Sequence, residues 1–183
     1  KSNYAPYHNL NHLLTVLKYV DYIADGEEVY YDQLTGLYLA ALFHDVNHSA
    51  GELNDTDNIM NAKLAFHNFA FENNLKPDLI KEVDSLIDAT QFPYTFPNSA
   101  ATQFQKIIRD ADMMQQFEYN WINQTTLGLA AEGKQDIKEF IKKQRHFLES
   151  IVFLTDTANR YKKENWKTIM KEFRILEVTL EIC

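Results

Sequence analysis

Residues 39–48, LAALFHDVNH, join an apolar run to an adjacent His44-Asp45 pair, and this stretch decides how the rest of the chain is interpreted. Apolar residues upstream recur at helical spacing, so we expect a helix that begins near Asp32 and ends at the pair. An ionisable pair next to an apolar core is costly to bury unless something compensates its charge. A bound metal ion would be one such compensation.

The segments on either side of this stretch also have helical periodicity. We expect helices over residues 6–25, 32–43, 55–74, 77–89, 101–119, 121–129, 137–153 and 158–180, and a loop over 91–99. Pro6 suits the first turn of the first helix, which would then carry both His8 and His12. Asp55 and Asp57 can cap the third. The fold class predicted is all-α, a compact multi-helix bundle.

The composition favours one helical domain spanning residues 1–183. Hydrophobic residues make up 45% of the chain, whereas only 5 Gly and 4 Pro are present, which disfavours both a turn-rich β fold and disorder. A net charge of -8 makes nucleic acid a poor partner, because its phosphate backbone would be repelled. A small phosphorylated nucleotide can still bind where a metal supplies local positive charge.

Cys183 is the only cysteine, so we expect no internal disulfide, no thiolate metal cluster and a reducing, cytoplasmic setting. No apolar stretch is long enough to span a membrane, and no secretory leader is evident. A start at Lys1 rather than Met suggests that residues upstream were removed. The sequence does not indicate an oligomeric state.

A mixed set of imidazoles and carboxylates is available for a metal site. Residues four apart share a helix face, so His8 and His12 can serve one site, as can His44 and His48. Such a set suits Zn, Mn, Fe or Co, and a bridging carboxylate can hold a second, harder ion such as Mg or Mn. Any one histidine, taken alone, is more often a core residue than a ligand. The candidate ligands are His12, His44, Asp45 and Asp112.

Two motifs resemble the signatures of a known family. The run at 6–9, PYHN, with His12 and Val16, is similar to the opening signature of the class I cyclic nucleotide phosphodiesterases. The run at 40–48 followed by Gly51 is similar to their second signature. Both belong to the wider HD-domain phosphohydrolase superfamily, and the dyad with Asp112 alone would indicate only that superfamily. The resemblance implies a helical domain with a metal site at its centre.

Carried over to this chain, the resemblance implies roles for individual residues. His12, His44, Asp45 and Asp112 would bind the tighter metal, and Asp45 would also bind a second ion. His8 would be the general acid that protonates the departing ribose oxygen. His48 would support the attacking water or orient a ligand. The other two residues of the motif, Tyr7 and Asn9, would contact substrate or support the structure.

A third segment, 144–152, QRHFLESIV, resembles the phosphodiesterase region in which a glutamine contacts the purine and a phenylalanine stacks on it. By this match Gln144 would hydrogen-bond the base and Phe147 would cover its face. The alternative is a surface glutamine and a core phenylalanine on an amphipathic helix.

Several positions leave alternatives open. Asp112 is preferred to Asp110 as the ligand, and Asp110 would support it or bind Arg109. The family has Glu-Asn where this chain has Met60-Asn61, so a supporting carboxylate is absent unless Asp55 or Asp57 replaces it. His67 is either an extra metal ligand or, by preference, a residue at the surface or core edge. The chain is also shorter than the family's domains.

Three functions follow as hypotheses. The preferred one is a metal-dependent 3',5'-cyclic nucleotide phosphodiesterase. The second is another HD phosphohydrolase, a nucleotidase or a nucleoside triphosphohydrolase, which would need cations near the metal; Arg109 and Arg145 are the nearest by sequence. The third is a sensor that binds a nucleotide without turnover. The sequence distinguishes neither adenine from guanine nor one metal from another.

Overall fold

The fold consists of α-helices, as predicted, and no strand occurs within residues 5–182, the part of the chain that this computed structural model describes. Four short helical turns of 3-10 or π type connect them: Tyr31–Gln33, Asn98–Ala100, Gln115–Phe117 and Ile122–Thr126. The α-helices are α1 (Leu10–Gly26), α2 (Thr35–Phe43), α3 (Asp55–Glu72), α4 (Pro77–Thr90), α5 (Gln103–Met114), α6 (Leu127–Glu132), α7 (Ile137–Ser150) and α8 (Asp156–Thr179).

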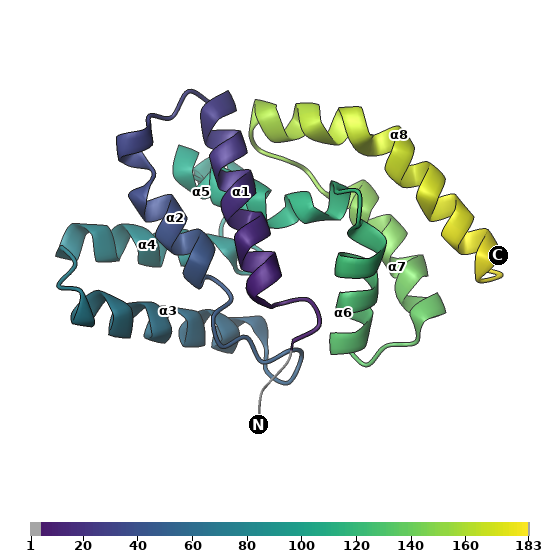
Figure 1. The fold of residues 1–183 in the computed structure, drawn as a ribbon, viewed down its shortest axis with the longest axis horizontal. Coiled ribbons are helices and arrows are strands. Elements are labelled where there is room, and N and C mark those ends of the chain that lie inside the picture. Colours follow the sequence, from purple (N-terminus) through teal and green to yellow (C-terminus); the bar gives the residue numbers. More distant parts are fainter. Residues whose placement is uncertain (1–4, 183) are drawn as a thin grey trace.

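Helix α1 runs through the middle of the molecule. In Figure 1, α2, α3 and α4 lie on one side of it, and α6, α7 and α8 lie on the other. Its main helix partners are α5 and α2, and α2 in turn packs on α4. None of the helices in the described part of the chain is long and apolar enough to cross a membrane.

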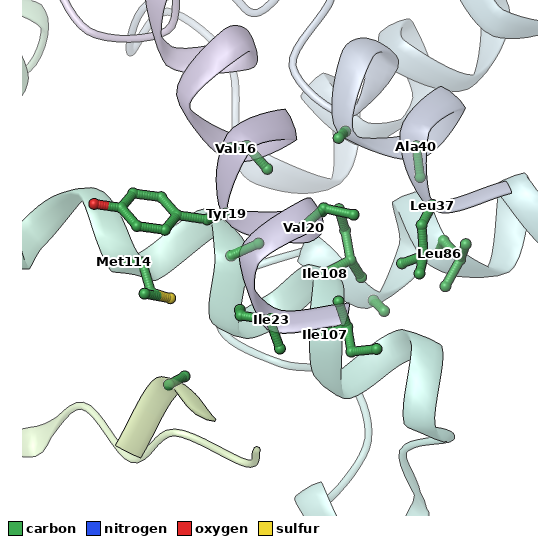
Figure 2. Close-up of a cluster of buried hydrophobic side chains, with 14 of the residues drawn as sticks. Val16, Tyr19, Val20, Ile23, Leu37, Ala40, Leu86, Ile107, Ile108 and Met114 are labelled. Carbon is green, nitrogen blue, oxygen red and sulfur yellow. The ribbon is translucent and has the colours of Figure 1, made fainter. Parts of the chain in front are cut away.

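The core forms where α1, α2, α4 and α5 meet (Figure 2). Helix α1 contributes Val16, Val20 and Ile23, and α5 contributes Ile107 and Ile108, all of them fully buried. Each such side chain removed from water contributes about 1.5–3 kcal/mol to folding. This packing fixes the facing surfaces of α1, α2 and α5, and these three helices carry the candidate ligands.

The first helix begins later than the sequence predicts. Its N-cap is Asn9, whose side-chain oxygen accepts the backbone N–H groups of Asn11 and His12 at 2.9 and 3.3 Å. Asparagine is a strong N-cap because it satisfies amides that have no partner within the helix. The expectation that Pro6 opens the helix and that His8 lies on it is therefore wrong, whereas His12 does lie on α1.

Other boundaries also differ, and α6 begins at Leu127, after the π-helix Ile122–Thr126, rather than at residue 121. Helix α2 begins at Thr35, after a 3-10 turn at Tyr31–Gln33, and ends at Phe43, so the His44-Asp45 pair closes it as predicted. The cap of α3 is Asn54 rather than Asp55 or Asp57. Helix α5 ends at Met114, and the chain continues as the 3-10 turn η3 (Gln115–Phe117).

Candidate metal centre

Four side chains from three helices converge beneath the surface. His12 lies in the first turns of α1, His44 caps α2 and is followed by Asp45, and Asp112 is near the end of α5. One ligand atom from each can be chosen so that all four lie within 4.8 Å of one another. Both histidines are only 1% exposed. The tetrad predicted from the sequence is therefore assembled, and it could hold a metal ion.

The spacing of these atoms fits a divalent ion. Nε2 of His12 lies 3.2 Å from Oδ2 of Asp45 and 3.2 Å from Oδ1 of Asp112. Nε2 of His44 lies 3.1 and 3.5 Å from the same two oxygens, and 3.3 Å from Nε2 of His12. Ligand atoms held about 2.1 Å from an ion lie about 3.0 Å apart in an octahedral arrangement and about 3.4 Å apart in a tetrahedral one. The five separations given above, 3.1–3.5 Å, lie close to these values.

Both imidazoles turn Nε2 toward the cluster and Nδ1 away from it. Nδ1 of His12 donates to Oε1 of Gln115 at 2.8 Å, and Nδ1 of His44 donates to the backbone oxygen of Ala41 at 3.0 Å. A ring that donates through Nδ1 can offer the lone pair of Nε2 to a metal. Both rings are thus oriented as ligands.

The charges of the tetrad are strongly coupled. Burial lowers the pKa of His12, but hydrogen bonds to Asp112 and Asp45 outweigh it and raise that pKa to about 9. Burial raises the pKa of Asp112, but hydrogen bonds from His12 and His44 outweigh it and lower that pKa to about 2. The carboxylates therefore stay ionised, and their negative charge is balanced by protons on the imidazoles in the metal-free protein. A divalent ion can take the place of those protons.

His8 approaches the same site from the segment before α1. Its Nδ1 lies 2.5 Å from Oε2 of Glu132, and Oε1 of Glu132 accepts the backbone N–H groups of Tyr7 and His8 at 2.6 and 2.8 Å. The pKa of Glu132 is raised by burial but lowered more strongly by its contacts with His8, so the net direction is down. The Glu132 carboxylate therefore fixes the position of His8 from the end of α6.

The sequence interpretation missed Glu132. It follows the apolar run 127–131 (LGLAA) directly, in the same way that His44-Asp45 follows residues 39–43. The argument about an ionisable group closing an apolar helix could have been applied to it as well. Because its partners lie about 125 positions away in the chain, only the fold brings them together.

His48 lies against His8, with the two rings stacked at 3.6 Å between centroids. The side-chain amide nitrogen of Asn58 is 3.0 Å from its Nε2. Burial and the neighbouring His8 lower the pKa of His48 to about 4, so its ring is neutral at pH 7. His8, Asp45 and His48 form a second group whose ligand atoms could hold a metal ion, and Asp45 belongs to both groups.

A cavity of about 180 Å³ opens over the tetrad. Tyr7, His8 and Phe147 are among its lining residues, but Gln144 is not. Gln144 is buried, and its Nε2 donates to Oε1 of Gln116, which does line the cavity. The predicted contact of Phe147 with the site is consistent with this geometry, whereas Gln144 reaches the cavity only through Gln116.

A second cavity of about 280 Å³ adjoins the first. Both are lined by Phe92, Met113 and Phe147, and the rings of Phe92 and Phe147 meet edge to face at 5.9 Å. None of the residues that line the first cavity is Lys or Arg. The described lining of both cavities therefore combines aromatic and polar side chains and contains neither Lys nor Arg.

Two further predictions concern the surroundings of this cavity. Asp55 lines it and accepts the backbone N–H of Phe92 at 2.7 Å, so a carboxylate borders the cavity although position 60 of this chain is Met. Asn9 does not line the cavity, because its side chain caps α1 and donates to the backbone oxygens of Ala5 and Pro6. The structure thus shows the supporting role for Asn9 that the sequence left open beside substrate contact.

The contacts of Asp110 and Arg109 show which of the roles predicted for them hold. Asp110 accepts from the backbone N–H groups of Leu154 and Thr155 and from the Thr155 hydroxyl, so it anchors the connection between α7 and α8 and does not bind Arg109. The guanidinium of Arg109 instead lies between two rings, 4.1 Å from Tyr94 and 4.0 Å from Phe96.

His67 and Arg145 lie apart from the cavity. His67 is a surface residue paired with Asp84 at 2.8 Å, as preferred from the sequence, and belongs to neither metal group. Arg145 pairs with Glu177 at 2.9 Å. Neither arginine proposed for extra phosphates therefore lines the cavity.

Comparison with known proteins adds information on the fold. No family model and no curated protein matches the chain. Among solved structures, the Lin1889 protein from Listeria innocua matches with a TM-score of 0.65 over 97% of this chain and 90% of that one, at 22% sequence identity. At this level of identity the likeness shows a shared helical fold and nothing about activity.

Proposed function

We propose that the chain is a divalent-metal-dependent phosphohydrolase that cleaves a phosphate ester, with a 3',5'-cyclic nucleotide as the preferred substrate. The observation that carries the proposal is the tetrad of His12, His44, Asp45 and Asp112 at ligand spacing, with His8 beside it. A divalent ion held there would supply an activated water and would neutralise charge that develops on the phosphoryl oxygens.

In this proposal the tetrad, Glu132 and His8 have different roles. Both imidazoles and both carboxylates of the tetrad would hold the tighter ion. Asp45 would also bind a second ion, and His8 would stay off the metals as the proton donor. Glu132 accepts from Nδ1 of His8 and keeps that ring over the cavity. A proton held at Nε2 of His8 can then pass to the departing oxygen as the ester bond breaks.

The two cavities support a single-phosphate substrate. Phosphate chains are usually held by several Lys or Arg side chains, and the lining of the first cavity contains neither. Phe92 and Phe147 can cover a planar organic group, and the second cavity gives that group room. These features favour a cyclic nucleotide or a nucleoside monophosphate over a triphosphate, and the resemblance of the two sequence motifs favours the cyclic ester.

A parallel substrate assay tests the proposal. The protein would be stripped with a chelator, reloaded separately with Zn²⁺, Mn²⁺, Co²⁺ or Mg²⁺, and incubated with cyclic, monophosphate and triphosphate purine nucleotides while the products are identified. We expect metal-dependent opening of the cyclic ester to a nucleoside monophosphate. Phosphate release from monophosphates alone would indicate a nucleotidase. Tight binding without any turnover would refute the enzymatic proposal and indicate a sensor.

A matched pair of variants assigns the activity to the tetrad. Asp45→Asn removes a proposed ligand charge and should abolish turnover with every metal. His67→Ala removes an exposed histidine that pairs with Asp84 outside the cluster, and it should leave turnover unchanged. Equal activity in both variants would place the chemistry elsewhere in the protein.

A further inference from the structure

The nitrogen of His12 that faces away from the cluster has a side-chain partner. Its Nδ1 donates to Oε1 of Gln115 at 2.8 Å, and both residues are 1% exposed. Gln115 is the first residue of the turn η3, three positions after Asp112. One short segment therefore carries both the proposed ligand Asp112 and Gln115, which contacts a second proposed ligand, His12, on the side away from the cluster.

The other end of the Gln115 amide is also bound. Its Nε2 donates to Oε1 of Gln124 at 3.0 Å. Gln124 lies in the π-helix η4 (Ile122–Thr126), a rare element that is frequently found at functional sites. With one end on His12 and the other on Gln124, the amide has its oxygen directed at the imidazole.

The direction of this amide decides what His12 can do. Nε2 of a neutral imidazole can bind a metal only when the proton is on Nδ1, and that proton needs an acceptor when the ring is buried. If the amide of Gln115 were reversed, its nitrogen would face Nδ1 and favour the opposite tautomer. His44 avoids this dependence, because its Nδ1 donates to the backbone oxygen of Ala41.

We infer that Gln115 is a positioning residue that holds His12 in its metal-binding tautomer, and that Gln124 maintains the orientation of the Gln115 amide. The inference rests on the metal centre of the proposed function and not on the identity of the substrate. Neither glutamine touches the reacting atoms in this scheme. Their effect is on the affinity of the site for a divalent ion.

Metal binding to the stripped protein tests this directly, without a substrate. Gln115→Met keeps the length of the side chain but removes the acceptor, and we expect about a 10–100-fold weaker affinity for Zn²⁺ or Mn²⁺. Gln115→Glu keeps an acceptor and should bind the ion at least as tightly as the native chain. Gln124→Met should weaken binding by a smaller factor, and Gln103→Met, an exposed position on α5, should have no effect.

A spectroscopic readout separates positioning from general damage to the fold. In the Zn²⁺-loaded protein labelled with ¹⁵N-histidine, the Nδ1–H proton of His12 should be protected from exchange with water. It should remain protected in Gln115→Glu and exchange rapidly in Gln115→Met. A loss of thermal stability alone would not produce this contrast. If Gln115→Met does not fold, the half-buried Gln124→Met variant must show the same faster exchange.

The outcomes distinguish the inference from the function on which it rests. Affinity in Gln115→Met within about twofold of native, or an equal loss in Gln115→Met and Gln115→Glu, would overturn the role of Gln115 while leaving the metal centre intact. A native chain that binds no divalent ion would overturn the metal centre and this inference together. Metal binding without hydrolysis would refute only the proposed enzymatic function.

Discussion

Removing the His8 imidazole is the sharpest test of how the site would work. His8 is held by Glu132 at 2.5 Å, and its side chain is 20% exposed, so it borders the cavity without being sealed in the core. In His8→Ala, Glu132 would keep its two backbone N–H donors, those of residues 7 and 8. We therefore expect the variant to fold and to retain its metal.

The size of the effect follows from the loss of a proton donor. General acid catalysis by a positioned side chain contributes about 10²–10⁴-fold to turnover. This factor corresponds to about 2.7–5.4 kcal/mol of activation free energy. Water entering the space left by His8 would be a poorly positioned and much weaker acid, so it should recover little of this factor.

The assay compares two leaving groups in native protein and in His8→Ala. A ribose alkoxide needs a proton to depart, whereas p-nitrophenolate is stable without one. The deficit of the variant should therefore be about 10²–10⁴-fold with a cyclic nucleotide and about tenfold or less with bis(p-nitrophenyl) phosphate. Equal deficits on both substrates, or loss of bound metal from His8→Ala, would refute the assignment and make His8 a ligand.

Three further predictions concern the metal, pH and the core. Asp45→Ala should lose both bound metal and activity, because this carboxylate is proposed to serve two ions; unchanged metal stoichiometry by elemental analysis would contradict the two-ion scheme. The pKa of His12 is raised from 6.5 to about 9 in the metal-free protein, by hydrogen bonds to the carboxylates that outweigh burial, so an ion must displace its proton at any pH below about 9. Metal affinity should rise with pH up to about pH 9, with proton release measurable by calorimetry in buffers of different ionisation enthalpy, and a pH-independent affinity below pH 9 would contradict the arrangement. The same proton stabilises the metal-free fold fully below pH 6.5, and this stabilisation is lost as pH rises through about 9. Ile108→Ala, at a fully buried position of α5, should lower the free energy of unfolding by about 2–5 kcal/mol in chemical denaturation, and a change below about 1 kcal/mol would contradict the core packing.

The helices were predictable because their signals are local. Apolar residues at helical spacing identified the α-helices other than α6, whereas most of the segment 121–129 forms the π-helix Ile122–Thr126 and α6 begins only at Leu127. Pro77 marked the start of α4 correctly. The boundaries were less predictable where two capping signals compete. Pro6 and Asn9 can both open a helix, and the hydrogen bonds of the Asn9 side chain decide between them.

The ligand set was predictable for a chemical reason. A histidine and an aspartate at the end of an apolar helix are costly to bury without a compensating charge, and His12 and Asp112 add the ligands with which a metal ion could supply it. The reasoning that His8 and His12 share a helix face was wrong, yet His8 still reaches the site. It does so because Glu132, at the far end of α6, holds the segment before α1 in place.

The amino-acid sequence by itself determined the helices, the tetrad of candidate ligands and the acidic character of the chain. Only the tertiary structure decided which polar residues support that tetrad: Glu132 behind His8, Gln115 behind His12, and Gln116 rather than Gln144 at the cavity. Helical periodicity and a buried charge are properties of neighbouring residues, so the sequence displays them. A hydrogen bond between residues about 100 or more positions apart depends on how the helices pack, and no local pattern encodes it.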